Sequence, residues 1–186
     1  MLVSQDLAGQ SLIWRQSSAT KEEYALLIGE DPEPVARLRW PKAMGSLAEA
    51  SAGEYAWTFK RVGFWRPNVT IRAAGSETDL ATFDPRWNGD GDLAFASGVT
   101  YRWHGSHVWN RTYAWRDADE RELVRFGPTK GILKSNATVE PTLEAAGVQD
   151  LSLLVLFGWY LLVMGNRDVG GAGATGAIVA TTATTT

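Results

Sequence analysis

Apolar and polar residues alternate along most of the chain in short runs. The clearest run covers residues 54–62, where Tyr55, Trp57 and Phe59 fall on one face of an extended chain and small or polar residues fall on the other. An alternation with a period of two residues is typical of a strand that buries one face. The pattern therefore predicts strands that turn one face toward a core.

Comparable runs recur between turn-forming Gly, Pro, Asn and Asp residues. The predicted strands cover residues 11–15, 24–28, 35–40, 54–62, 69–73, 79–83, 93–96, 99–103, 107–115, 122–126 and 132–139. Residues 43–50 are small and polar, and we expect a loop or a short helical turn there. About ten to twelve short strands, separated by turns at roughly 8–12-residue intervals, indicate an antiparallel barrel or sandwich.

Residues 151–164 break this alternation, because they are apolar on nearly every side of a helix and carry no charge. Such a helix must be buried in a protein core or in a membrane. Asp150 can cap its start, and Gly165 or Asn166 can end it. Gly158, in its middle, predicts a close approach by a strand side chain such as a tryptophan.

The apolar run is shorter than a membrane span, which needs about 20 residues. We therefore interpret it as a core helix, with a span as the alternative. A barrel closed around the helix would bury it on all sides and leave no exposed strand edges. We expect one mainly β domain over residues 1–168, with the helix at its centre. The glycines of residues 169–186 are poor helix formers, and we expect a flexible Gly/Ala/Thr-rich tail there.

Composition narrows the classes of function. The 186 residues are 45% hydrophobic and 11% aromatic, which is typical of a globular chain. A formal net charge of -3 argues against a nucleic-acid-binding protein, which needs a basic field. The lack of cysteine excludes disulfides, thiolate catalysis and cysteine zinc sites. No basic region precedes an apolar run at the N-terminus, as it would in a secretory signal, so we expect a cytoplasmic protein.

Four strand segments and the apolar helix together carry a resemblance to a known superfamily. These segments are residues 57–61, 69–72, 91–93, 98–103 and 151–164. In this order they resemble the tubby C-terminal-like superfamily, which includes the tubby proteins, the phospholipid scramblases, the LURP-one-related proteins and simpler bacterial relatives. The resemblance implies a closed antiparallel barrel of about twelve strands around a hydrophobic C-terminal helix.

The resemblance also implies a class of partner, because members of this superfamily are associated with phospholipids or membranes. The chain lacks the palmitoylated cysteine run and the proline-rich N-terminus of the scramblases. The resemblance therefore does not extend to scramblase activity. A phosphoinositide site of the tubby type is not matched residue by residue either.

The most basic local segment is the candidate binding site. It contains Lys60, Arg61, Arg66 and Arg72, with Trp65 at the tip of a predicted turn. Cations beside aromatic rings suit an anionic phospholipid head group at a membrane interface. The same residues would also suit a solvated barrel rim with snorkelling side chains.

The two histidines, His104 and His107, flank a predicted turn. A zinc site would need a third ligand, for which Asp84, Asp90 and Asp92 are candidates. We interpret both histidines as exposed or hydrogen-bonded turn residues, and we expect no metal site and no cofactor.

Two further patterns match known motifs only formally. Asn88, Asp90 and Asp92 alternate like the start of a calcium loop, but Leu93 breaks that pattern and hairpin-turn chemistry explains it. Residues 171–176 match G-x-G-x-x-G but lack the acidic residue about twenty positions on that dinucleotide binding requires.

Taken together, these features predict a non-enzymatic barrel that binds phospholipid, or another anionic or apolar ligand, peripherally at a membrane surface. We expect no nucleic-acid partner, and no protein partner is indicated. One alternative is a structural or protein-interaction module. The other is an unrecognised hydrolase that uses turn carboxylates with His104 or His107.

Overall fold

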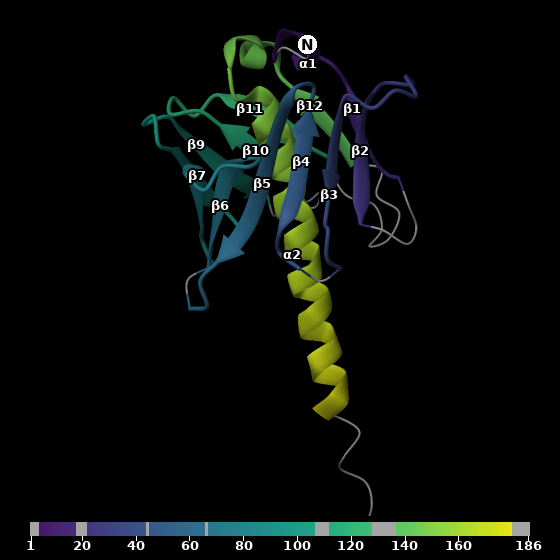
Figure 1. Cartoon of the computed structure of the whole chain (residues 1–186), viewed down its shortest axis with the longest axis vertical. Coiled ribbons are helices and arrows are strands. Elements are labelled where there is room, and N and C mark those ends of the chain that lie inside the picture. The colour runs from purple at the N-terminus through teal and green to yellow at the C-terminus, as the bar shows by residue number, and fades with distance from the viewer. Residues whose placement is uncertain are drawn as a thin grey trace, which may run out of the picture.

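Within the part of the chain that the structure describes, twelve antiparallel strands close into a barrel around one long helix (Figure 1). The structure is a computed structural model, and it describes residues 4–17, 22–43, 45–65, 67–106, 112–127 and 137–179. Each strand pairs with its neighbours in sequence, and β1 also pairs with β12, which closes the sheet. The predicted closed antiparallel barrel with a central helix is therefore confirmed.

The elements follow one another in a simple up-and-down order. They are α1 (Ser4–Leu7), β1 (Leu12–Gln16), β2 (Glu23–Ile28), β3 (Ala36–Arg39), β4 (Ala48–Ala52), β5 (Tyr55–Val62), β6 (Asn68–Ala73), β7 (Asp79–Pro85), β8 (Gly91–Phe95), β9 (Thr100–Ser106), β10 (Thr112–Arg116), β11 (Glu122–Phe126), β12 (Ala137–Pro141), η1 (Leu143–Gly147) and α2 (Leu151–Val179).

Strand β4 corrects the expectation of a loop or helical turn over residues 43–50. It pairs with β3 on one side and β5 on the other. Its alternate residues Ala48, Ala50 and Ala52 are buried, and Cα atoms of α2 come within 8 Å of Cα atoms of β4. Small side chains are needed where the helix lies this close, and they hid the apolar alternation that identifies a strand.

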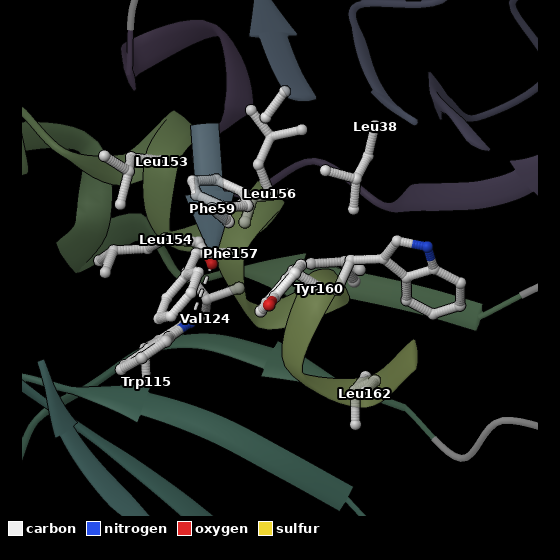
Figure 2. Close-up of a cluster of buried hydrophobic side chains, with 14 of the residues drawn as sticks. Leu38, Phe59, Trp115, Val124, Leu153, Leu154, Leu156, Phe157, Tyr160 and Leu162 are labelled. Carbon is white, nitrogen blue, oxygen red and sulfur yellow. Dashed lines mark hydrogen bonds between the residues drawn. The ribbon is translucent and has the colours of Figure 1, made fainter. Parts of the chain in front are cut away.

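The first part of α2 fills the barrel. Leu154, Phe157 and Tyr160 have no exposed surface (Figure 2). The ring centroid of Phe157 lies 5.1 Å from that of Phe59 on β5, in an edge-to-face arrangement. The Trp115 indole N–H donates a 2.8 Å hydrogen bond to the Leu154 carbonyl, which satisfies a polar group that the aromatic side chain carries into the core.

The helix is longer than predicted. It does not end at Gly165 or Asn166 but continues to Val179. A glycine inside a helix costs only about 1 kcal/mol relative to alanine. The residues just after Gly165 fasten the helix to the barrel: Arg167 Nη1 donates to the Gly45 carbonyl at 2.9 Å, and Asp168 accepts two hydrogen bonds from Arg61. These contacts favour continuation of the helix past the predicted end.

The predicted domain boundary at residue 168 stays a prediction. The flexibility expected for residues 169–186 stays a prediction, and residues 180–186 lie outside the described residues. Among the helices that the structure describes, none combines the length and the hydropathy needed to cross a lipid bilayer.

The two ends of the barrel differ. Helix α1 and η1 lie together at the end where α2 begins (Figure 1). Because neighbouring strands are antiparallel, the β3–β4, β5–β6 and β7–β8 loops share the opposite end, where α2 leaves the barrel. We term these three loops, together with Arg167 and Asp168 of α2, the exit rim.

Candidate functional site

Arg61 is the member of the predicted basic set that faces the central helix. It follows Phe59 by two residues on β5, so its side chain lies on the inner face, at the exit rim. Its Nη1 and Nη2 donate to the two carboxylate oxygens of Asp168 at 3.1 and 2.8 Å. The hydrogen bond to Asp168 raises the pKa of Arg61 above its ordinary value. The bidentate pair neutralises this cation.

The other predicted cations lie elsewhere. Lys60 is exposed on the outer face of β5. Arg72 is on β6 opposite Thr58, and its Nε donates to Asp79 at 2.6 Å. Arg66 lies outside the described residues. The structure therefore separates Arg61, on the inner face, from Lys60 and Arg72, which share the outer face of β5 and β6.

The exit rim instead gathers aromatic side chains. Phe64 and Trp65 on the β5–β6 loop are 89% and 91% exposed, and Trp87 on the β7–β8 loop is fully exposed. Among the described residues these are the three most exposed large apolar side chains. Trp65 belongs to the binding segment predicted from the sequence, whereas Trp87 was missed. The sequence feature that could have indicated Trp87 is the presence of a tryptophan inside the polar turn of residues 84–92.

A pocket of about 790 Å³ lies between these two loops. Small-molecule sites commonly span about 300–1,000 Å³. Two exposed indoles, two guanidinium groups and three carboxylates contribute to its lining: Trp65, Trp87, Arg61, Arg86, Asp84, Asp92 and Asp168. The pocket joins residues from three stretches of the chain, 61–67, 84–92 and 168, which the fold of the barrel around α2 brings together.

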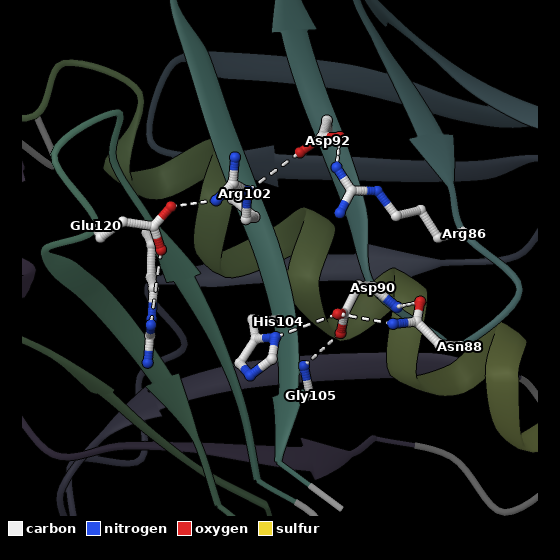
Figure 3. A network of polar contacts seen from close by, with 9 residues as sticks. Arg86, Asn88, Asp90, Asp92, Arg102, His104, Gly105 and Glu120 are labelled. Atoms are coloured by element: carbon white, nitrogen blue, oxygen red, sulfur yellow. Dashed lines mark hydrogen bonds and ion pairs between the residues drawn. The ribbon is translucent and has the colours of Figure 1, made fainter.

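The charges in this pocket are largely paired with one another. Arg61 binds Asp168, and Arg86 binds Asp92, which Arg102 also approaches to 3.5 Å (Figure 3). Asp84 lies directly opposite Asp92 across β7 and β8. Two arginines against three aspartates leave the described lining with one net negative charge, and Asp84 is the carboxylate without a cationic partner among the described residues.

A second polar group holds the β7–β8 loop in place. Asp90 is only 8% exposed, and its carboxylate accepts hydrogen bonds from the Gly105 N–H at 2.9 Å and the Asn88 amide at 3.0 Å (Figure 3). Its Oδ2 also lies 3.2 Å from His104 Nδ1. Burial alone would raise the pKa of Asp90, but the hydrogen bonds from Gly105, His104 and Asn88 outweigh it and hold the pKa below its ordinary value.

This arrangement bears on the predicted role of the histidines. His104 is a hydrogen-bonded residue, as expected, although it lies on β9 and not in a turn. His107 lies outside the described residues. In the described parts of the chain, no three histidine, aspartate or glutamate side chains are grouped so that they could hold a metal ion. Asp90 acts as an anchor that joins the β7–β8 loop to β9.

Comparisons of the chain with protein-family models, with curated proteins and with solved structures gave no match. Membership of the tubby C-terminal-like superfamily therefore stays a prediction from the sequence pattern.

Proposed function

We propose that the protein is a non-enzymatic barrel that attaches to the surface of a phospholipid membrane through its exit rim. One observation carries this proposal: Phe64, Trp65 and Trp87 project, almost completely exposed, from two neighbouring loops at the same end of the barrel. Tryptophan is enriched at membrane–water interfaces, where its ring meets acyl chains and its N–H meets water. A cluster of exposed apolar side chains marks an interaction surface.

The filled interior favours attachment from outside. Leu154, Phe157 and Tyr160 of α2 are enclosed by strand side chains, so a ligand meets the barrel at its surface. The proposal agrees with the predicted kinship to the tubby C-terminal-like superfamily, which we retain as part of it. The aromatic rim takes the leading role in place of the predicted basic segment, because Arg61 and Arg72 are already paired with carboxylates.

Flotation of the purified protein with phosphatidylcholine vesicles, with and without phosphatidylglycerol, tests the proposal. We expect the protein to float, and we expect added salt to weaken flotation only slightly because the described arginines of the rim are paired. The double variant Phe64→Ser, Trp87→Ser should bind at least about tenfold more weakly, since each buried aromatic ring contributes roughly 1.5–3 kcal/mol.

Tyr55→Ser is the matched control, because Tyr55 is 51% exposed on the strand end away from the exit rim. It should float like the parent protein. A parent protein that stays with the soluble fraction, or a double variant that floats as well as the parent, would contradict membrane attachment. A stable protein partner captured by the same rim would then favour the interaction-module alternative.

A further inference from the structure

The pocket between the β5–β6 and β7–β8 loops has walls that suit a cation. Trp65 and Trp87 both contribute exposed indole rings to it. Phe64 lies beside the pocket at the hairpin tip, with its ring centroid 5.5 Å from that of Trp65 and the two planes at 90°. Aromatic faces attract cations through the negative potential of the ring, and tryptophan does so best.

The pairing of charges disfavours an anion there. An anion would have to compete with Asp168, which holds Arg61 by two hydrogen bonds, and with Asp92, which is paired with Arg86. Asp84, in contrast, has no cationic partner among the described residues and faces Asp92 across the strand pair. Because Asp92 is already paired with Arg86, Asp84 is the carboxylate of the described lining whose charge a bound cation would balance.

The chemistry of the lining also selects among cations. A calcium or magnesium ion needs several converging oxygen ligands, and the described residues hold no such group. A quaternary ammonium group has no N–H to satisfy and presents a weakly hydrated surface of methyl groups, which fits aromatic walls beside a single carboxylate.

We infer that this pocket binds a quaternary ammonium group, with Trp65 and Trp87 against its methyl groups and Asp84 balancing its charge. Its source is either the choline head group of a phosphatidylcholine membrane, in which case the inference rests on the proposed function, or a free choline-type metabolite. The class of ligand is the same in both cases.

Calorimetric titration of the full chain with tetramethylammonium chloride tests the pocket without any membrane. Sodium chloride at the same ionic strength serves as the blank. We expect saturable binding, and binding of choline but not of 3,3-dimethyl-1-butanol, its uncharged analogue of the same shape. A parent protein that gives the same heat as the blank, or that binds the uncharged analogue equally well, overturns the inference.

Single substitutions test whether tetramethylammonium binds in this pocket. Trp87→Leu and Asp84→Asn should each weaken tetramethylammonium binding by about fivefold or more. Tyr55→Leu and Glu77→Gln alter an exposed aromatic and an exposed acid away from the exit rim, and they should leave binding unchanged. All four positions are exposed, so circular dichroism should report intact folds. If Trp87→Leu binds tetramethylammonium as tightly as the parent does, the ligand does not bind in this pocket.

Vesicles separate this inference from the proposed function. We expect tetramethylammonium to compete with phosphatidylcholine vesicles for the parent protein, and not with phosphatidylglycerol vesicles. If the protein binds tetramethylammonium saturably but does not float with vesicles, this result would contradict membrane attachment and assign the pocket to a free metabolite. If the protein floats with vesicles but does not bind tetramethylammonium, this result would contradict the quaternary ammonium site and still support membrane attachment.

Discussion

The ring of Phe126 on β11 lies against the backbone of α2 at Gly158, where a Cβ atom would come within 2.3 Å of Phe126 Cζ. The sequence predicted such a close approach at Gly158, and the side chain that makes it is a phenylalanine instead of the suggested tryptophan. Both residues are in the filled interior, and Phe126 has no exposed surface. Glycine is therefore required here for space and not for backbone conformation.

Gly158→Ala should destabilise the protein by about 1–3 kcal/mol, because overpacking a filled core outweighs the better helix propensity of alanine. Urea unfolding followed by circular dichroism measures this difference. Gly165→Ala is the matched control: it lies in the same helix, and a Cβ there meets nothing within 4 Å. That variant should be about as stable as the parent or more stable by up to about 1 kcal/mol. A Gly158→Ala protein that gains stability would contradict the close contact.

Leu154 tests the enclosure of the helix. Leu154→Ala should lower the free energy of unfolding by about 2–5 kcal/mol, because it leaves a cavity in a packed core. Leu154→Asp should prevent folding, since the buried residues that the structure describes include no cationic side chain to pair with it. Thermal unfolding compares both with Leu143→Ala, a change at a leucine that is 77% exposed and that should alter stability by less than about 0.5 kcal/mol. Equal effects of the two alanine changes would contradict a buried helix.

Arg167 fastens α2 where it leaves the barrel. Its guanidinium lies 4.7 Å from the centre of the Trp40 ring, its Nη2 lies 2.5 Å from Glu22 Oε2, and its Nη1 donates to the Gly45 carbonyl. Arg167→Met should cost about 1–3 kcal/mol, because it leaves Glu22 without its cation in a partly buried place. A double-mutant cycle with Glu22→Gln should show that the two changes are not additive. Additive losses would mean that the ion pair contributes nothing.

Asp90 makes stability depend on pH. Its folded-state pKa is lowered, so ionised Asp90 contributes stability above the unfolded-state pKa near 3.8, and this contribution is lost as pH falls through the folded-state value. Asp90→Asn should cost about 1–3 kcal/mol at pH 7, because a carboxylate accepts stronger hydrogen bonds than an amide. The difference between parent and variant should shrink between pH 5 and pH 3, measured by denaturant unfolding, with exposed Glu77→Gln as the control. A difference that does not change over this range would contradict the role given to Asp90.

Local patterns along the sequence determined much of the architecture. Strand β5 was predicted from the alternation of Tyr55, Trp57 and Phe59, and the buried helix from a run that is apolar on all sides. Both are properties of neighbouring residues, because a strand repeats every two residues and a helix about every 3.6. Where inward side chains are small, as at Ala48 and Ala50, the alternation is lost and β4 was missed.

The candidate site was decided only by the tertiary structure. Arg61 and Asp168 are 107 positions apart in the sequence and form an ion pair. The charge of Arg61, which was predicted to bind an anionic head group, is therefore neutralised within the protein. Trp65 and Trp87 share one pocket because antiparallel pairing of β5 to β8 places their loops at the same end. The length of α2 depends on the same kind of contact. Asp168 binds Arg61 on β5, and Arg167 binds Gly45 in the β3–β4 loop and Glu22 just before β2, and no pattern within the helix reveals these partners. Charge pairing and the surroundings of a loop depend on which distant segments the closed barrel brings together, and hydrophobic periodicity carries no information about them.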